Sequence, residues 1–288
     1  MLFVSGKIND DLLEVTDSYE KTTRLISIKD ALTLGTRVYG LYSNGTVIMY
    51  SSVQKFLNMF HMRQALCNSL ASYEIDYDTQ SGLITMRSCL LSDSITHDLA
   101  IPDFVDVIDD YVFKMCLILR SVVIPESVRR IGCDCFDGCK NLESVVMEGT
   151  SGFELDIGEC AFRGCEALEH VGISNAITHL GSGCFNFCSS LDKIQLPDSV
   201  KTIGEFCFGG CSSLQSVVLP SFIDSLPTKC FYGCVSLGSI VIPDSVKVIG
   251  VECFKGCVSL SSVRLSDNLR EIGSNAFKGC IVRIRSFA

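Results

Sequence analysis

The sequence has little of what nucleic-acid-binding and membrane-spanning proteins need. Lys and Arg number 24 against 33 Asp and Glu, which gives a formal net charge of −9, and no run of basic residues interrupts this balance. A nucleic-acid partner is not expected, because binding to phosphate backbones depends on clustered positive charge. No apolar stretch approaches the roughly 18 residues that span a bilayer, and the first segment turns acidic before a signal-peptide core forms. We therefore expect no membrane insertion and a cytoplasmic location.

Residues and motifs that carry catalysis are also sparse. The chain has no Trp and only four His, and it contains no G-x-S-x-G, P-loop or H-E-x-x-H motif. His61 and Cys67 lie six residues apart on a predicted helix, which does not match the i, i+3 or i+4 spacing of side chains that meet. We predict that the protein is not an enzyme and that it has no cofactor.

Cysteine is abundant, and its positions follow a repeat. Eight of the 17 Cys come three residues after a Phe, and successive Phe are 23 residues apart except for one interval of 26. The longer interval holds a three-residue insertion ahead of Cys160. The eight pairs are Phe113/Cys116, Phe136/Cys139, Phe162/Cys165, Phe185/Cys188, Phe208/Cys211, Phe231/Cys234, Phe254/Cys257 and Phe277/Cys280.

Other apolar residues fall into columns with the same period. The unit is V-x-x-I-G-x-x-(C/A)-F-x-G-C-x-x-L-x-x-V-x-I-P, with Ile131, Ile203 and Ile249 in one column and Leu142, Leu214 and Leu260 in another. A 23-residue unit is too short to bury its own apolar face, so successive units must stack into a solenoid with a shared core. The β-branched segment before Pro favours one short parallel strand per coil. The Gly after the Ile column marks a tight corner that needs either a positive φ or close backbone approach.

The columns also explain most of the thiols. Five further Cys precede a Phe, at positions 135, 184, 207, 230 and 253, in a slot that Ala161 and Ala276 also occupy. This exchange is typical of a small buried apolar site, and free Cys behaves as a small hydrophobe. Cys133, Cys135 and Cys139 superficially suggest zinc, but side chains in parallel columns do not converge on one point, so we expect no metal. Reduced, stacked thiols are favoured over disulfides, which fits a reducing compartment.

Residues 1–92 lack the period and predict a small α+β region. VYGLYSNGTVIMY indicates two strands around Asn44-Gly45, and EIDYDTQSGLITM indicates a second hairpin. Between them, residues 51–73 favour a helix, with Val53, Phe56 and Phe60 near one face. This region is interpreted either as a cap on the first coil or as a separate docking domain, ahead of a solenoid over residues 93–288.

The repeat resembles the BspA-like class of leucine-rich repeats. The shared pattern is C-x-x-L-x-x-V-x-I-P-x-S-V-x-x-I-G-x-x-C/A-F-x-G-C, and it covers about residues 101 to 288 in eight copies. The resemblance implies a right-handed, arc-shaped leucine-rich-repeat solenoid that binds other macromolecules. Many relatives are exported surface adhesins, so a cell-surface location is the alternative to the cytoplasm.

The strand of each coil predicts where a partner binds. In V-x-I-P the V and I side chains point into the core, so the residue before V and the residue between V and I face outward. The outward residues are mostly Ser in the first column and Val in the second, with a few polar exceptions. Either these β-branched residues only support the strands, or they form a surface for a protein or peptide partner. The candidate binding residues are Val123, Val146, His170, Lys193, Gln195, Val218, Val241 and Arg264.

A structural role is the main alternative to partner recognition. The sequence CIVRIRSFA breaks register after Cys280 without a polar capping module. An open coil edge of this kind exposes backbone groups that pair with another chain, so we keep an oligomer formed through the C-terminal edge as a second hypothesis.

Overall fold

The structure is a computed structural model of the whole chain. The described residues are the strands within 2–9, 12–17, 23–27, 38–41, 47–50 and 71–77, followed by residues 83–91, 97–101, 105–149 and 154–282. The chain divides into two compact units. One comprises residues 1–96 and 102–107, and the other comprises residues 97–101 and 108–288.

The first unit begins with a five-stranded sheet of order β3-β2-β1-β4-β5. Its strands are β1 (Leu2–Asn9), β2 (Leu12–Asp17), β3 (Thr23–Ser27), β4 (Val38–Leu41) and β5 (Val47–Tyr50). β4 and β5 pair antiparallel from Leu41↔Val47 outward, which confirms the two strands predicted around Asn44-Gly45. The sequence analysis did not predict β1, β2 and β3.

The second predicted hairpin is also present in this unit. β6 (Ala71–Tyr77) pairs antiparallel with β7 (Ile84–Leu91), and Tyr77 lies opposite Ile84 next to the turn. The predicted helix falls mainly on residues 51–70, which lie outside the described residues. Its last three residues, 71–73, belong to β6 instead.

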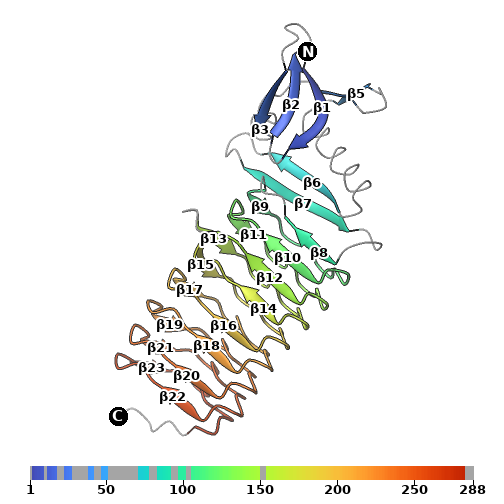
Figure 1. Cartoon of the computed structure of the whole chain (residues 1–288). Coiled ribbons are helices and arrows are strands. Elements are labelled where there is room, and N and C mark those ends of the chain that lie inside the picture. The colour runs from blue at the N-terminus through green and yellow to red at the C-terminus, as the bar shows by residue number, and fades with distance from the viewer. Residues whose placement is uncertain are drawn as a thin grey trace. The chain divides into compact units, whose positions relative to one another are not determined.

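The second unit is a solenoid of eight coils, and each coil has two short strands (Figure 1). The first strand of each coil is the one predicted from the β-branched segment. These strands are β8 (Asp98–Ala100), β10 (Ser121–Ile124), β12 (Ser144–Met147), β14 (His170–Gly172), β16 (Lys193–Gln195), β18 (Ser216–Val218), β20 (Ser239–Val241) and β22 (Ser262–Arg264). Equivalent residues pair in parallel register, as in Val122↔Val145 and Ile240↔Val263. We call their outward surface the strand face.

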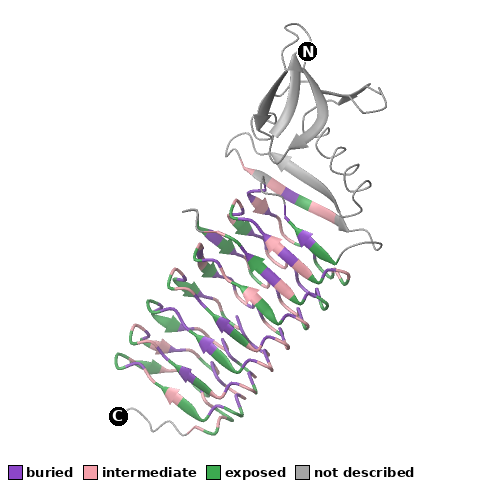
Figure 2. Cartoon of the chain, viewed as in Figure 1, coloured by how far each residue is buried: buried purple, intermediate pink, exposed green. Residues whose placement is uncertain are grey.

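The second strand of each coil was not predicted. It ends at the Ile column or its equivalent, and it pairs in parallel with the same strand of the next coil, as in Ile131↔Ile157, except between coils 5 and 6. These strands are β9 (Val107–Ile108), β11 (Arg130–Ile131), β13 (Leu155–Ile157), β15 (Ile177–Leu180), β17 (Thr202–Ile203), β19 (Ser225–Leu226), β21 (Val248–Ile249) and β23 (Glu271–Ile272). Buried and exposed residues alternate along both sets of strands (Figure 2).

The core is organised around a ladder of phenylalanine rings. The eight Phe of the repeat stack with centroids 4.8 to 5.7 Å apart and with interplanar angles of at most 12°. Phe136, Phe162, Phe185, Phe208, Phe231 and Phe254 are fully buried. Because burial of one Phe side chain stabilises a fold by about 2 to 3 kcal/mol, this column is a main source of cohesion between coils. The predicted solenoid architecture is confirmed.

Each coil reverses direction in a turn segment between its second strand and its Cys column, such as residues 250–257 in coil 7. We call the surface formed by successive turn segments the turn face. The first Gly of the segment allows close backbone approach, because a Cβ on Gly250 would lie 2.5 Å from the Thr228 amide nitrogen. This Gly has no positive φ, so the second of the two predicted explanations is the correct one.

Positive φ occurs instead at two other positions of every turn segment. In coil 7 these are Glu252 (φ 54) and Gly256 (φ 80). The amides of Glu252, Phe254 and Gly256 donate hydrogen bonds of 2.7 to 3.0 Å to carbonyl oxygens of coil 8. In coils 1 to 7 the left-handed backbone thus points three amides of each turn segment along the solenoid axis, where the next coil supplies the acceptors.

Candidate functional site

The strand face presents the outward residues that the sequence analysis selected. Val146, Val218 and Val241 expose 43%, 55% and 54% of their surface. By contrast, Val145, which precedes Val146 on the same strand and points inward, is fully buried. Val123 is half-buried. The polar members His170, Lys193, Gln195 and Arg264 are all exposed.

Strand pairing brings several of these residues side by side. Val123 is the register partner of Val146, Gln195 is the partner of Val218, and Val241 is the partner of Arg264. The first-strand ladder is interrupted twice, between β14 and β16 and between β18 and β20, because these strands belong to separate sheets. His170 on β14 and Lys193 on β16 flank the first interruption, whereas Val218 on β18 and Val241 on β20 flank the second.

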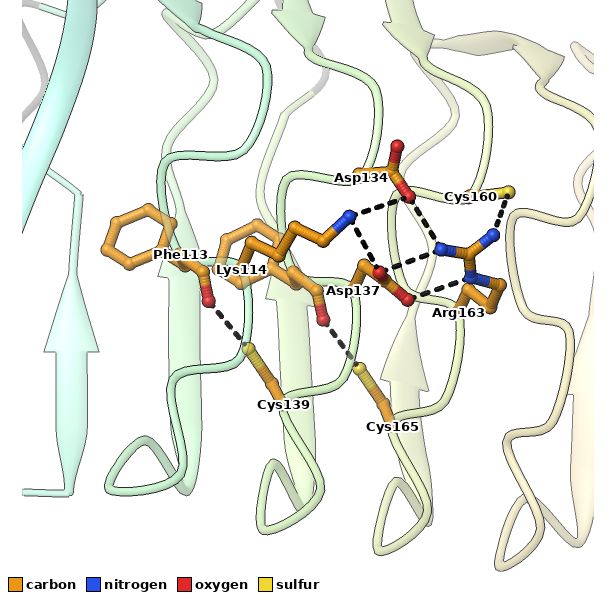
Figure 3. Close-up of polar contacts among 9 residues, drawn as sticks. Phe113, Lys114, Asp134, Asp137, Cys139, Cys160, Arg163 and Cys165 are labelled. Atoms are coloured by element: carbon orange, nitrogen blue, oxygen red, sulfur yellow. Dashed lines mark hydrogen bonds and ion pairs between the residues drawn. The ribbon is translucent and has the colours of Figure 1, made fainter.

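The buried thiols have a second role beside packing. The thiol of Cys165 donates a hydrogen bond to the carbonyl oxygen of Phe136 in the preceding coil, with an Sγ···O distance of 3.2 Å (Figure 3). The same bond recurs at every later Cys of this column, at 3.1 to 3.2 Å. Core packing is confirmed for both Cys columns apart from Cys116 and Cys280, which are half-exposed in the first and last coils. The donor role was missed, because the repeat pattern does not show which carbonyl a thiol reaches.

Burial keeps these thiols protonated. It is the main reason that the pKa of the Cys139 thiol rises to about 12 and that the pKa of Cys165 lies well above its ordinary value. The sixteen cysteines among the described residues are all free. Cys135 and Cys139 of the zinc-like cluster are buried members of the columns, whereas Cys133 is half-exposed. Because thiolates are the nucleophilic and metal-binding form, the buried columns are poorly suited to either chemistry.

An ion-pair network across coils 1 to 3 on the turn face was not predicted. Arg163 donates two hydrogen bonds of 2.8 Å to the two carboxylate oxygens of Asp137 and a third of 3.0 Å to Asp134 (Figure 3). Lys114 adds ion pairs to the same carboxylates at 3.1 and 3.7 Å. The hydrogen bond from Arg163 is the main cause of the lowered pKa of Asp137. A fourth contact of 3.4 Å runs from the guanidinium to the Cys160 sulfur.

A second network lies on the turn face of coils 5 to 7. Glu252 accepts an ion pair from Lys255 at 2.7 Å and another from Lys229 at 3.7 Å. The Lys229 ammonium lies 4.8 Å from the centre of the Phe206 ring, and the Lys255 ammonium lies 5.6 Å from that of Tyr232. Charged residues at the position after Phe were the signal in the sequence, but the period does not show their partners: Lys255 pairs with Glu252 of its own coil, and Glu252 also pairs with Lys229 of the preceding coil.

Other candidates from the sequence are not brought into a site. His61 and Cys67 lie outside the described residues. Residues 283–288, on which the C-terminal edge hypothesis partly depends, also lie outside them, so that hypothesis stays a prediction. Within the described part of the chain, no group of three or more His, Cys, Asp or Glu is placed to hold a metal ion.

Comparison with known protein families decides the classification. The family described as BspA type Leucine rich repeat region matches residues 65–155 and 155–284 in six copies. The chain belongs to this family. Its repeat suggests a protein-interaction or surface scaffold role, and leucine-rich-repeat solenoids are generally non-enzymatic.

One solved structure supports the family and the fold. The leucine-rich repeat protein TpLRR of T. pallidum is 30% identical with a TM-score of 0.57, and the match covers 65% of this chain and 87% of that one. A leucine-rich repeat protein of Eubacterium ventriosum is 19% identical with a TM-score of 0.43, over 64% of this chain and 70% of that one. No curated protein matches the chain. Among the described residues, no helix has the length and apolar character to cross a bilayer.

Proposed function

We propose that this BspA-type solenoid is a non-catalytic scaffold that binds a protein or peptide on its strand face. The observation that carries the proposal is the exposure of Val146, Val218 and Val241, each more than two fifths exposed in one outward column. Strand propensity explains why these residues are β-branched, but it does not explain why they are apolar, because the polar β-branched residue Thr favours a strand as well as Val does. A row of exposed Val therefore favours a surface that a partner covers.

The polar residues of the strand face fit the same role. Lys193 and Gln195 lie on β16, beside the Ser216 and Val218 positions of β18. Hydrogen-bonding groups next to apolar residues give a protein interface its orientation and specificity, while the apolar residues give most of its affinity. We assign recognition of partner polar groups to His170, Lys193, Gln195 and Arg264.

A paired substitution tests the proposal. In Val218→Asp/Val241→Asp, two charges enter the apolar row, and we expect the variant to lose the proteins that the wild type retains in pull-downs from the native cell. Val258→Asp is the matched control, because Val258 is 52% exposed and lies outside the strand face. Retention of the same partners by the double variant, with its fold intact by circular dichroism, contradicts the assignment of the site.

A cytoplasmic location belongs to the same proposal, and it is supported by the sixteen free thiols, since reducing compartments preserve them. The alternative is export to the cell surface, as in an adhesin. Fractionation of native cells separates the two, because the proposal requires the protein in the soluble cytosolic fraction. Recovery from the surface fraction favours the adhesin.

A further inference from the structure

Three aromatic residues occupy left-handed backbone positions on the turn face, Tyr111 in coil 1 and, in two neighbouring coils, Phe187 and Phe206. The second left-handed position holds Gly in six of eight coils, but coil 4 has Phe187, with φ 61 and 59% of its surface exposed. The first left-handed position of coil 5 holds Phe206, with φ 56. A bulky side chain with positive φ is strained, and neither ring is buried in the core. Strain of this kind is concentrated at functional sites, where the residue type is needed for another reason.

The backbone of coil 5 fixes the place of the Phe187 ring. A Cβ on Gly210 would come within 2.6 Å of Phe187 Cδ1, so the ring lies directly over that glycine. The Phe187 amide donates a 2.8 Å hydrogen bond to the carbonyl oxygen of Gly209, which holds the residue against the next coil. Phe187 is therefore a positioned aromatic group with its outer surface open to solvent.

Positive charge accompanies these rings in the following coils. Lys229 lies over Phe206, and Lys255 lies beside Tyr232, which is 39% exposed. Both ammonium groups share the single carboxylate of Glu252, which leaves an excess of one positive charge in this network. By contrast, Lys114 and Arg163 in coils 1 to 3 face two carboxylates, so that network is balanced. The excess stands out in a chain whose formal net charge is −9.

We propose that Phe187, Phe206, Lys229, Tyr232 and Lys255, which we call the turn-face patch, bind an acidic peptide segment that also carries aromatic side chains. The exposed rings of Phe187 and Tyr232 offer stacking surfaces for aromatic groups of the segment. The ammonium groups attract its carboxylates, and the nearby rings reduce their hydration, which strengthens the attraction. This surface is separate from the strand face, so it adds a second interaction site to the scaffold.

The experiment uses the full chain and a fluorescein-labelled peptide of four Glu-Glu-Phe repeats, followed by fluorescence anisotropy. We expect Phe187→Gly to weaken binding about tenfold or more, as loss of an interface anchor does. Its fold is maintained, because six coils have Gly at the same position. Met115→Gly is the matched control: Met115 occupies this position in coil 1, has φ 60 and is 57% exposed. It leaves binding unchanged.

Two further measurements test the role of charge, one with a variant of the protein and one with a basic peptide. Lys229→Asn, in which Asn tolerates the left-handed backbone, is expected to weaken binding and to reduce its salt dependence. A peptide of Lys-Lys-Phe repeats binds at least about tenfold more weakly than the acidic probe. The proposal is overturned if the acidic probe does not bind, if Phe187→Gly binds it as tightly as wild type, or if both probes bind equally. Val218→Asp/Val241→Asp retains the probe, which separates this result from the strand-face proposal.

Discussion

The thiol of Cys139 donates a hydrogen bond to the carbonyl oxygen of Phe113, one coil earlier, across 3.0 Å. The donor belongs to a buried column, and the acceptor belongs to the residue that starts the aromatic ladder. The bond therefore ties two columns of the repeat together between coils. Seven of the eight Cys in this column donate such a bond, which accounts for the constancy of Cys there, whereas the slot before Phe also accepts Ala.

The two Cys columns should differ in their tolerance of Ala. In coil 6, Cys234 donates to the Phe208 carbonyl at 3.1 Å, and Cys230 lies in the slot that Ala161 and Ala276 occupy elsewhere. We expect Cys234→Ala to lower the free energy of unfolding by about 1 to 2 kcal/mol, because it removes a buried donor and leaves a small cavity. Cys230→Ala should cost less. Urea denaturation of both variants measures the difference, and equal losses contradict the donor role.

The buried thiols predict a fall in stability at alkaline pH. The pKa of Cys139 is about 12 in the folded chain, and an unfolded thiol ionises near ~8.5. Below that value both states are protonated, so these thiols do not change the free energy of unfolding. Above it only the unfolded state ionises, and each such thiol destabilises the fold by ~1.4 kcal/mol per pH unit until its folded pKa is reached.

Urea denaturation between pH 6 and pH 10 checks this prediction. The midpoint should be unaffected by thiols up to pH 8 and should fall steeply above it. Cys139→Ala should have a shallower fall, because it removes one contributing thiol. A wild-type midpoint that stays constant to pH 10 is incompatible with a protonated column.

Substitution of a Phe in the aromatic ladder should lower the stability of the fold far more than substitution of an exposed Phe. Phe208 is fully buried and stacks between Phe185 and Phe231 with centroid distances of 5.7 and 5.4 Å. Phe208→Ala is expected to cost about 3 to 5 kcal/mol, through lost burial and a cavity. Phe222→Ser is the control, since Phe222 is 75% exposed and equivalent positions in other coils hold Ser. Thermal unfolding compares the two, and similar losses exclude the ladder as a main source of cohesion.

The ion-pair network of coils 1 to 3 should stabilise the fold mainly through the buried carboxylate of Asp137. Asp137 is only 8% exposed and accepts both hydrogen bonds of a bidentate Arg163 contact. Asp137→Asn should cost about 1 to 3 kcal/mol, because a charge-assisted bond is lost beside a partly buried guanidinium. The lowered pKa of Asp137 means that its contribution is present above pH ~4 and is lost as the pH falls through the folded pKa.

A surface pair provides the comparison for this network. Lys140 and Glu166 lie 2.9 Å apart, but both side chains are 53% exposed. Glu166→Gln should therefore change the free energy of unfolding by less than ~0.5 kcal/mol. If denaturation curves at pH 7 show equal effects for the two substitutions, the buried carboxylate has no special role.

The sequence allowed prediction of everything that depends on the period. A shared 23-residue spacing places Phe208, Leu214 and Cys211 in columns, and stacking then requires all three to be buried, as they are. The second strand was missed because two-residue strands such as β21 are too short to show alternation. The left-handed backbone at Cys160 and Phe206 was missed as well, because these residue types do not favour it.

The candidate site was predictable only in part. Outward positions follow from alternation, so the exposure of Val218 and Val241 was foreseen. The interruptions between β14 and β16 and between β18 and β20 were not, because strand separation depends on how whole coils pack. The contact between Arg163 and Asp134 joins residues 29 positions apart in different columns, and no periodic pattern indicates which charged side chains across that distance will meet.

Site-specific crosslinking tests the central claim, that the strand face is where a partner binds. A photoreactive phenylalanine analogue is placed at Val146, Val218 or Val241, one position at a time, and the protein is irradiated in the native cell. We expect a crosslinked product of the same mass from all three positions and none from the matched exposed position Val258. Crosslinks from Val258, with none from the three strand-face positions, contradict this claim.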